Sequence, residues 1–166
     1  VESLREIVVD HMVQDDLYSR IALDALAQIA VRNPPLAASS QVFSVMIEAI
    51  VNPYFKAMQE ALIIAILFLM NDASSRKYLY NVEHILAPLN GAQGSSGLES
   101  VQLSVRALTI MLKSWPGLIW AAKTGGMLAL VSGLRHKDAN VAALILDAFF
   151  EVLRIPHPGT NNPFQR

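Results

Sequence analysis

The sequence predicts an all-α fold, a right-handed α-solenoid of about four helical repeats. Helical periodicity dominates the 166 residues, and no region shows the sustained alternation of apolar and polar residues that marks a strand. Several long apolar segments are similar to one another, which is the signature of a repeat protein. Apolar residues make up 53% of the chain and charged residues 16%, so a large core is expected and some apolar surface should face a partner.

Start and stop signals define the predicted helices of the first half. Asp16 is an acidic cap for the second helix, and Asn33-Pro34-Pro35 ends it, because proline cannot continue the hydrogen-bond ladder. Pro53 begins a longer helix at a position where its missing N–H is harmless. The expected helices are 2–14, 16–32, 41–51 and 53–71, followed by short pieces at 74–80 and 82–89.

The second half begins after a Gly/Ser-rich stretch at 90–97, whose composition predicts a flexible loop. Residues 156–166 contain three prolines and predict an extended tail, so the helical segment should cover 1–155. The expected helices between them are 98–114, 115–123, 127–136 and 138–155.

A repeat becomes visible when four long segments are aligned on their alanines. The segments are RIALDALAQIAV, AMQEALIIAILF, SVRALTIML and LILDAFFEVLRI, aligned at Ala25, Ala61, Ala107 and Ala148. A mean spacing of about 41 residues is typical of armadillo or HEAT repeats. A small residue at each aligned site is expected to let neighbouring helices approach closely. The predicted repeats are 1–33, 34–72, 73–114 and 115–155.

Composition argues against several classes of function. Thirteen basic and fourteen acidic residues give a net charge of -1, so nucleic acid is not an expected partner. The apolar run 61–70 is about half the length needed to cross a bilayer, so we expect a buried helix and no membrane span. The chain has no cysteine, and its four histidines stand far apart, so no catalytic, cofactor-binding or metal-binding residue is expected.

The stretch Lys123-Thr124-Gly125-Gly126 has the residue types of a phosphate-binding loop. Such a loop follows a strand and places its lysine after the glycines, whereas here a helix precedes it and the lysine comes first. We therefore predict a turn in which Gly125 ends a helix in a left-handed conformation. For Trp115, we expect packing at the junction of two helices; the alternative is an exposed aromatic anchor for a partner.

Candidate partner-binding residues lie at two positions on the long helices, directly before each aligned alanine and three residues after it. Armadillo domains that hold extended peptides carry Trp and Asn ladders at these positions, and neither ladder is present here. A peptide groove of the nuclear-import or catenin type is therefore not expected. The charged residues that take these places are candidates for contact with a basic partner surface: Asp24, Glu60, Arg106, Asp147 and Glu151.

Short motifs add a specific resemblance. GGMLALVSGLRHKDANVAALILDAFFEVL resembles an armadillo repeat, in which a Gly-Gly turn leads to a medium and then a long helix. Arg-x-Tyr at 76–78, Ile-Leu-Ala-Pro at 85–88, Ser-Trp-x-Gly at 114–117 and Arg-Ile-Pro-x-Pro at 154–158 occur in one order. These stretches resemble the N-terminal armadillo region of the Rictor/pianissimo family, and we expect a fungal-like member.

The resemblance implies a scaffold without catalytic activity in TOR complex 2. The implied partners are TOR kinase, a Sin1-type subunit and substrates of the AGC-kinase class. The implied location is the cytoplasm, with membrane association through the complex. The alternative is an armadillo or HEAT adaptor of another pathway, such as a GTPase-binding or trafficking scaffold.

Overall fold

The computed structural model describes residues 1–166 except 11, 13–15, 91–96 and 155–166. All regular structure in the described part is α-helix or 3-10 helix, and this part contains no strand. The predicted all-α class is therefore confirmed. The predicted tail at 156–166 and most of the predicted loop at 90–97 lie outside the described residues.

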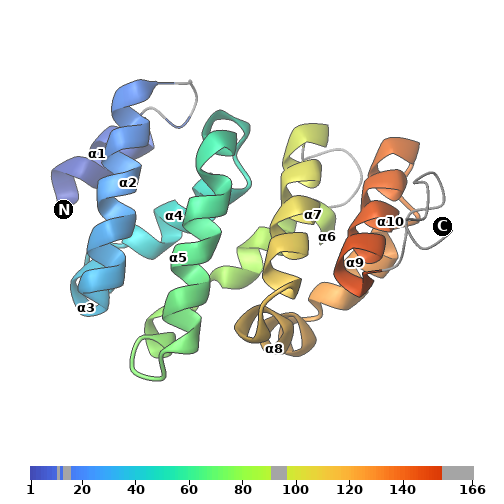
Figure 1. Ribbon diagram of the computed structural model, residues 1–166. Helices are drawn as coiled ribbons and strands as arrows, with labels where there is room; N and C mark the ends of the chain where they lie inside the picture. Colours follow the sequence, from blue (N-terminus) through green and yellow to red (C-terminus); the bar gives the residue numbers. More distant parts are fainter. Residues whose placement is uncertain (11, 13–15, 91–96, 155–166) are drawn as a thin grey trace, which may run out of the picture.

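The long helices lie side by side in chain order, from α2 through α5 and α7 to α10 (Figure 1). Each of these helices contacts the next one along the chain. The shorter elements connect them. The elements are α1 Glu2–Asp10, α2 Leu17–Arg32, α3 Pro34–Ser39, α4 Val42–Ile50, η1 Pro53–Met58, α5 Gln59–Asn71, η2 Arg76–Tyr78, η3 Val82–Leu86, α6 Ala87–Asn90, α7 Leu98–Leu112, α8 Trp115–Thr124, α9 Gly126–Gly133 and α10 Ala139–Leu153.

Capping side chains set the starts of two long helices, α2 and α10, where the sequence predicts them. Asp16 accepts a hydrogen bond from the Tyr18 N–H at the start of α2, and Asp138 accepts one from the Asn140 N–H at the start of α10. Helix α3 was not predicted. Asn33 ends α2 as expected, but its side chain then accepts a hydrogen bond from the Leu36 N–H, 3.2 Å away. The prolines after Asn33 therefore begin a new helix as well as ending the previous one.

The stretch Pro53–Asn71, predicted as one helix, consists of two. The 3-10 helix η1 comes first, and its Phe55 has non-helical angles (φ -106°, ψ 16°) and a buried ring. By length and composition, this 19-residue stretch is the one candidate membrane span in the described part of the chain. However, Leu62, Ile63 and Ile66 of α5 are at most 1% exposed in the protein core, so length and composition do not establish a span.

The helical run 61–70 is buried on one face only. Ile64 and Phe68 of α5 are 56% and 60% exposed, on the side opposite the core residues. The expectation of a buried helix therefore holds for one face, while the other face contributes to the apolar surface that the composition predicts.

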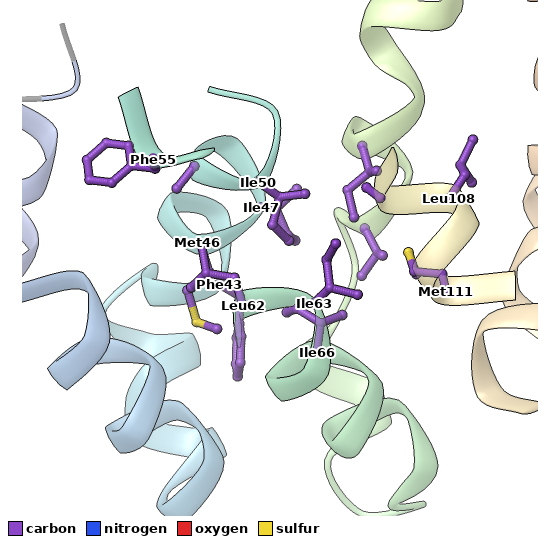
Figure 2. Packing of buried hydrophobic residues seen from close by; sticks show 14 of the residues in the cluster. Phe43, Met46, Ile47, Ile50, Phe55, Leu62, Ile63, Ile66, Leu108 and Met111 are labelled. Atoms are coloured by element: carbon purple, nitrogen blue, oxygen red, sulfur yellow. The ribbon is translucent and has the colours of Figure 1, made fainter. Parts of the chain in front are cut away.

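The buried apolar side chains form one continuous cluster from Val8 in α1 to Ala148 in α10. Figure 2 shows part of it, where side chains of α4, α5 and α7 gather between these helices. Gln59 of α5 is a buried polar residue in this core. Its Nε2 donates hydrogen bonds to the carbonyls of Ile50 in α4 and Leu103 in α7, each 2.8 Å away. These bonds tie three helices together inside the core.

The aligned alanines do not all have the close-packing role predicted for them. Ala107 and Ala148 are buried, but Ala25 is half-buried and Ala61 is exposed. The residue that follows each alanine carries the packing more consistently. Leu26, Leu62 and Leu108 are at most 1% exposed, and Phe149 is partly buried against the core. The core position that the four aligned segments share therefore lies one residue after the aligned alanines.

Candidate protein-binding groove

A groove of about 620 Å³ runs across η1, α5, α7 and α10, along the row of long helices. It contains Glu60 from α5, Arg106 from α7, and Asp147 and Glu151 from α10. All of these side chains are exposed. They line one groove because α5, α7 and α10 lie side by side and each contacts the next (Figure 1). The structure thus brings together four of the five predicted site residues.

Asp24 is the exception. It lines a separate hollow of about 230 Å³ between α2 and α5, together with Ala61 and Leu62. Its carboxylate accepts a hydrogen bond from Gln28 Nε2 at 2.8 Å, one turn further along α2. Asp24 therefore does not share the groove of the other four candidate residues, because its side chain lines a different hollow.

The groove has balanced charge. Three basic side chains and four carboxylates line it, for a net charge of -1. Lys113 and Glu151 form an ion pair across α7 and α10. Arg106 lies between Glu60 on one side and Asp147 on the other, and within the described part of the chain its guanidinium has no hydrogen bond or ion pair.

Several lining residues were not predicted. Lys56 precedes Glu60 by one helical turn, and Glu99 and Lys113 lie two turns before and after Arg106. Helical spacing from the predicted residues was the available signal for them. A second hollow of about 470 Å³ shares Lys56, Glu60 and Arg106 and adds Arg20 of α2, so the groove continues toward the first long helix.

The sequence matches the family described as "Rapamycin-insensitive companion of mTOR, N-term" over residues 2–165. The chain belongs to this family. Pianissimo A of Dictyostelium discoideum is 27% identical over 169 residues, which cover 87% of this chain and 15% of that protein. Rapamycin-insensitive companion of mTOR from Mus musculus and from Homo sapiens is 22% identical over 172 residues, which cover 93% of this chain and 10% of each protein.

The chain therefore spans 10% to 15% of the length of these relatives. No solved structure matches it. The Rictor N-terminal family is a non-catalytic scaffold region, so the prediction that this chain is not an enzyme is confirmed.

The Ser-Trp-x-Gly motif at 114–117 has a structural explanation. Ser114 caps α8: its Oγ accepts a hydrogen bond from the Gly117 N–H and donates one to the Met111 carbonyl at 2.9 Å. A Cβ on Gly117 would lie 2.6 Å from the Met111 carbonyl carbon, so only glycine fits. Trp115 is 73% exposed, and the expectation that it packs at a helix junction is wrong. Trp120, one turn later, supplies the buried ring.

Another motif also has a local structural role. In Arg-x-Tyr, Arg76 Nε donates to the Met70 carbonyl at 2.9 Å and so satisfies the C-terminal end of α5. Just before it, Asp72 accepts hydrogen bonds from the hydroxyls of Ser74 and Ser75, each 2.5 Å away. These bonds, Ser74 first and Ser75 second, lower the pKa of Asp72 below its usual value of 3.8.

The Lys-Thr-Gly-Gly stretch is a turn, as predicted. Gly125 has φ 77° and ends α8 in the left-handed conformation, and Gly126 is the first residue of α9. Thr124 Oγ1 donates to the Trp120 carbonyl at 2.8 Å, which is a bond within the helix. The histidines and carboxylates of the described residues form no cluster that could hold a metal ion.

Proposed function

We propose that this chain is a scaffold segment of a TOR complex 2 subunit, acting in protein assembly and substrate presentation in TOR kinase signalling. The family match over residues 2–165 is the observation that carries this proposal. The proposed partners are TOR kinase, a Sin1-type subunit and substrates of the AGC-kinase class. The proposed location is the cytoplasm, with membrane association through the complex.

The proposed architecture is a right-handed α-solenoid of about four armadillo-like or HEAT-like repeats. Two observations support it. Each long helix contacts the next along the chain, and one apolar cluster continues from α1 to α10. A stack of this kind presents an extended surface along its length, which suits a protein that holds several partners. The repeat bounds 1–33, 34–72, 73–114 and 115–155 remain predictions.

The groove across α5, α7 and α10 is the proposed contact surface for one of these partners. It is open and lined by charged side chains from three helices, and its charges nearly balance. Such a surface favours a partner with its own ordered pattern of charges, because electrostatic complementarity selects the partner and orients it. The exposed Ile64 and Phe68 follow Glu60 by one and two turns of α5 and add apolar contact area on the same helix.

Co-purification from cells tests this function. The intact protein carrying an affinity tag should recover TOR kinase and a Sin1-type subunit. Reversing the central charge with Arg106→Glu should weaken recovery of at least one partner, whereas Lys123→Glu, on the exposed end of α8 outside the groove, should leave recovery unchanged. Failure of the unaltered protein to recover any TOR complex 2 subunit would overturn the proposal and favour an adaptor in another pathway.

A further inference from the structure

Helix α8 is apolar on all sides, yet only one side is covered. Residues 115–122, WPGLIWAA, contain no charged side chain. One face is buried and consists of Gly117, Trp120 and Ala121. The opposite face carries four exposed apolar residues at the spacing i, i+3, i+4 and i+7: Trp115, Leu118, Ile119 and Ala122. A helix that is apolar all round is normally buried, so this exposed face is suited to an apolar occupant.

The exposed face of α8 is not part of a groove. The helix contacts α5, α7 and α9, and in Figure 1 it lies at the lower end of the long helices. The groove and the two hollows described above contain no residue of α8. A peptide or helix from a partner protein is usually held in a groove. Lipid chains adapt to the shape of a helix that lies among them, so a bilayer surface requires no groove.

The charge around α8 has one sign. Residues 100–137 contain no acidic residue and five basic ones, although the whole chain has a net charge of -1: Arg106, Lys113, Lys123, Arg135 and Lys137. The first two line the groove. The last three are exposed and form no ion pair within the described part of the chain. Lys123 lies one turn after Ile119, at the edge of the apolar face. Its positive charge there favours an anionic lipid surface.

Helix α2 provides a contrast. Its Tyr18 is 75% exposed, which is close to the 73% of Trp115, and Ile21 of the same helix is also exposed. However, Asp16 caps this helix, and Asp24 follows Ile21 by three residues. Carboxylates beside exposed apolar residues are repelled by the negative potential of anionic lipids. Exposed apolar residues on α2 therefore do not favour such a surface, whereas those on α8 do.

We propose that α8 binds directly to an anionic lipid surface. Trp115, Leu118 and Ile119 enter the boundary between headgroups and acyl chains, where tryptophan is favoured, and Lys123 contacts lipid phosphate groups. The helix lies in the plane of the membrane, because its 10 residues are only about 15 Å long. This inference goes beyond the proposed function, in which membrane association comes through the complex, because here the chain itself contacts lipid.

Vesicle flotation with the intact protein tests the proposal. The protein should float with vesicles of phosphatidylcholine and about 30% phosphatidylserine, and should bind about tenfold more weakly to phosphatidylcholine alone. Trp115→Ala and Lys123→Glu should each weaken binding to the anionic vesicles about tenfold. Tyr18→Ala removes an equally exposed aromatic ring from α2 and should bind as the unaltered protein does. No binding to anionic vesicles, or equal losses in Trp115→Ala and Tyr18→Ala, would overturn the proposal.

Tryptophan fluorescence locates the contact within the protein. The chain has two tryptophans, of which Trp115 is exposed and Trp120 is 8% exposed. Anionic vesicles should shift the emission to shorter wavelength as Trp115 leaves water. Trp115→Phe keeps an apolar ring and should still bind, but the shift should be lost because Trp120 is already buried. Binding without a shift in the unaltered protein would place the contact elsewhere and refute the role of α8.

The same variants separate this inference from the proposed function. If vesicles do not bind and Trp115→Ala instead weakens recovery of TOR complex 2 subunits, α8 is a protein contact and this inference is overturned. If vesicles bind through α8 but the unaltered protein recovers no TOR complex 2 subunit, the lipid contact stands and the proposed function falls. Circular dichroism of each variant verifies that the helical fold is retained.

Discussion

Replacing Gly117 by alanine should destabilise the fold through the turn between α7 and α8. The added Cβ would lie 2.6 Å from the Met111 carbonyl carbon and closer still to its oxygen. Atoms in ordinary contact are about 3.5–4.0 Å apart, so the turn must open by about 1 Å or more. That movement acts on the backbone, which cannot rotate away as a flexible side chain can.

The size of the expected loss of stability follows from the hydrogen bonds in this turn. Opening it strains or breaks the hydrogen bonds that Ser114 Oγ makes to Gly117 N–H and to the Met111 carbonyl, 3.2 and 2.9 Å long. Loss of each hydrogen bond lowers the free energy of unfolding by about 1 kcal/mol, and the steric strain lowers it by about 1 kcal/mol more. Alanine recovers about 1 kcal/mol, because glycine loses more conformational freedom in a helix. The expected net loss is therefore about 2 kcal/mol in the free energy of unfolding.

Urea denaturation followed by circular dichroism measures this loss, and Trp115→Ala is the matched control. Both positions lie in the same motif, but the Trp115 ring is largely exposed, so its removal should change stability by less than about 0.5 kcal/mol. A Gly117→Ala protein as stable as the unaltered one would refute the steric argument. A Trp115→Ala protein that loses as much as Gly117→Ala would show that the exposed ring contributes to the fold.

Three further predictions concern other described residues. Gln59→Met keeps the side-chain volume but leaves the carbonyls of Ile50 and Leu103 without their amide donor. It should lower the free energy of unfolding, measured by urea denaturation, by about 2 kcal/mol. An unchanged free energy of unfolding would show that these two hydrogen bonds do not stabilise the fold. Gly126→Val places a Cβ 3.2 Å from backbone and side-chain atoms of the preceding helix. It should lower the melting temperature, and the packing of the last helices should be lost first. An unchanged melting temperature would contradict the assignment of this stretch as a tight turn. The pKa of Asp72 is lower in the folded protein than the ordinary 3.8, so its stabilising effect is present above about pH 4 and is lost as the pH falls through the folded pKa. The stability difference between the unaltered protein and Asp72→Asn should therefore shrink below about pH 4 in urea titrations; a difference independent of pH would contradict the lowered pKa.

Local signals in the sequence predicted the secondary structure well where a single side chain decides it. Asp16 and Gly125 each fix a helix end through a side chain or a backbone angle, and each is found where expected. The signals were weaker where one residue serves two elements. Asn33 ends one helix and caps the next, and the prolines after it were interpreted only as a stop signal.

The candidate site was predicted in part, and the reason is geometric. Aligning the long segments placed Glu60, Arg106 and Asp147 at equivalent positions, and neighbouring helices then bring equivalent positions together. Asp24 has an equivalent position too, yet it lies in another hollow. An alignment of segments in the sequence does not specify how far apart two helices lie or which side chains lie between them.

By itself, the sequence determined the all-α class, several helix ends and the family, because these depend on local chemistry and on the order of short motifs. Only the tertiary structure decided which aligned residues share a groove, that Trp115 is exposed, and that Gln59 links three helices. Those facts depend on contacts between residues far apart in the chain. A periodic pattern shows which face of a helix is apolar, but the neighbouring helix decides how much of that face is covered.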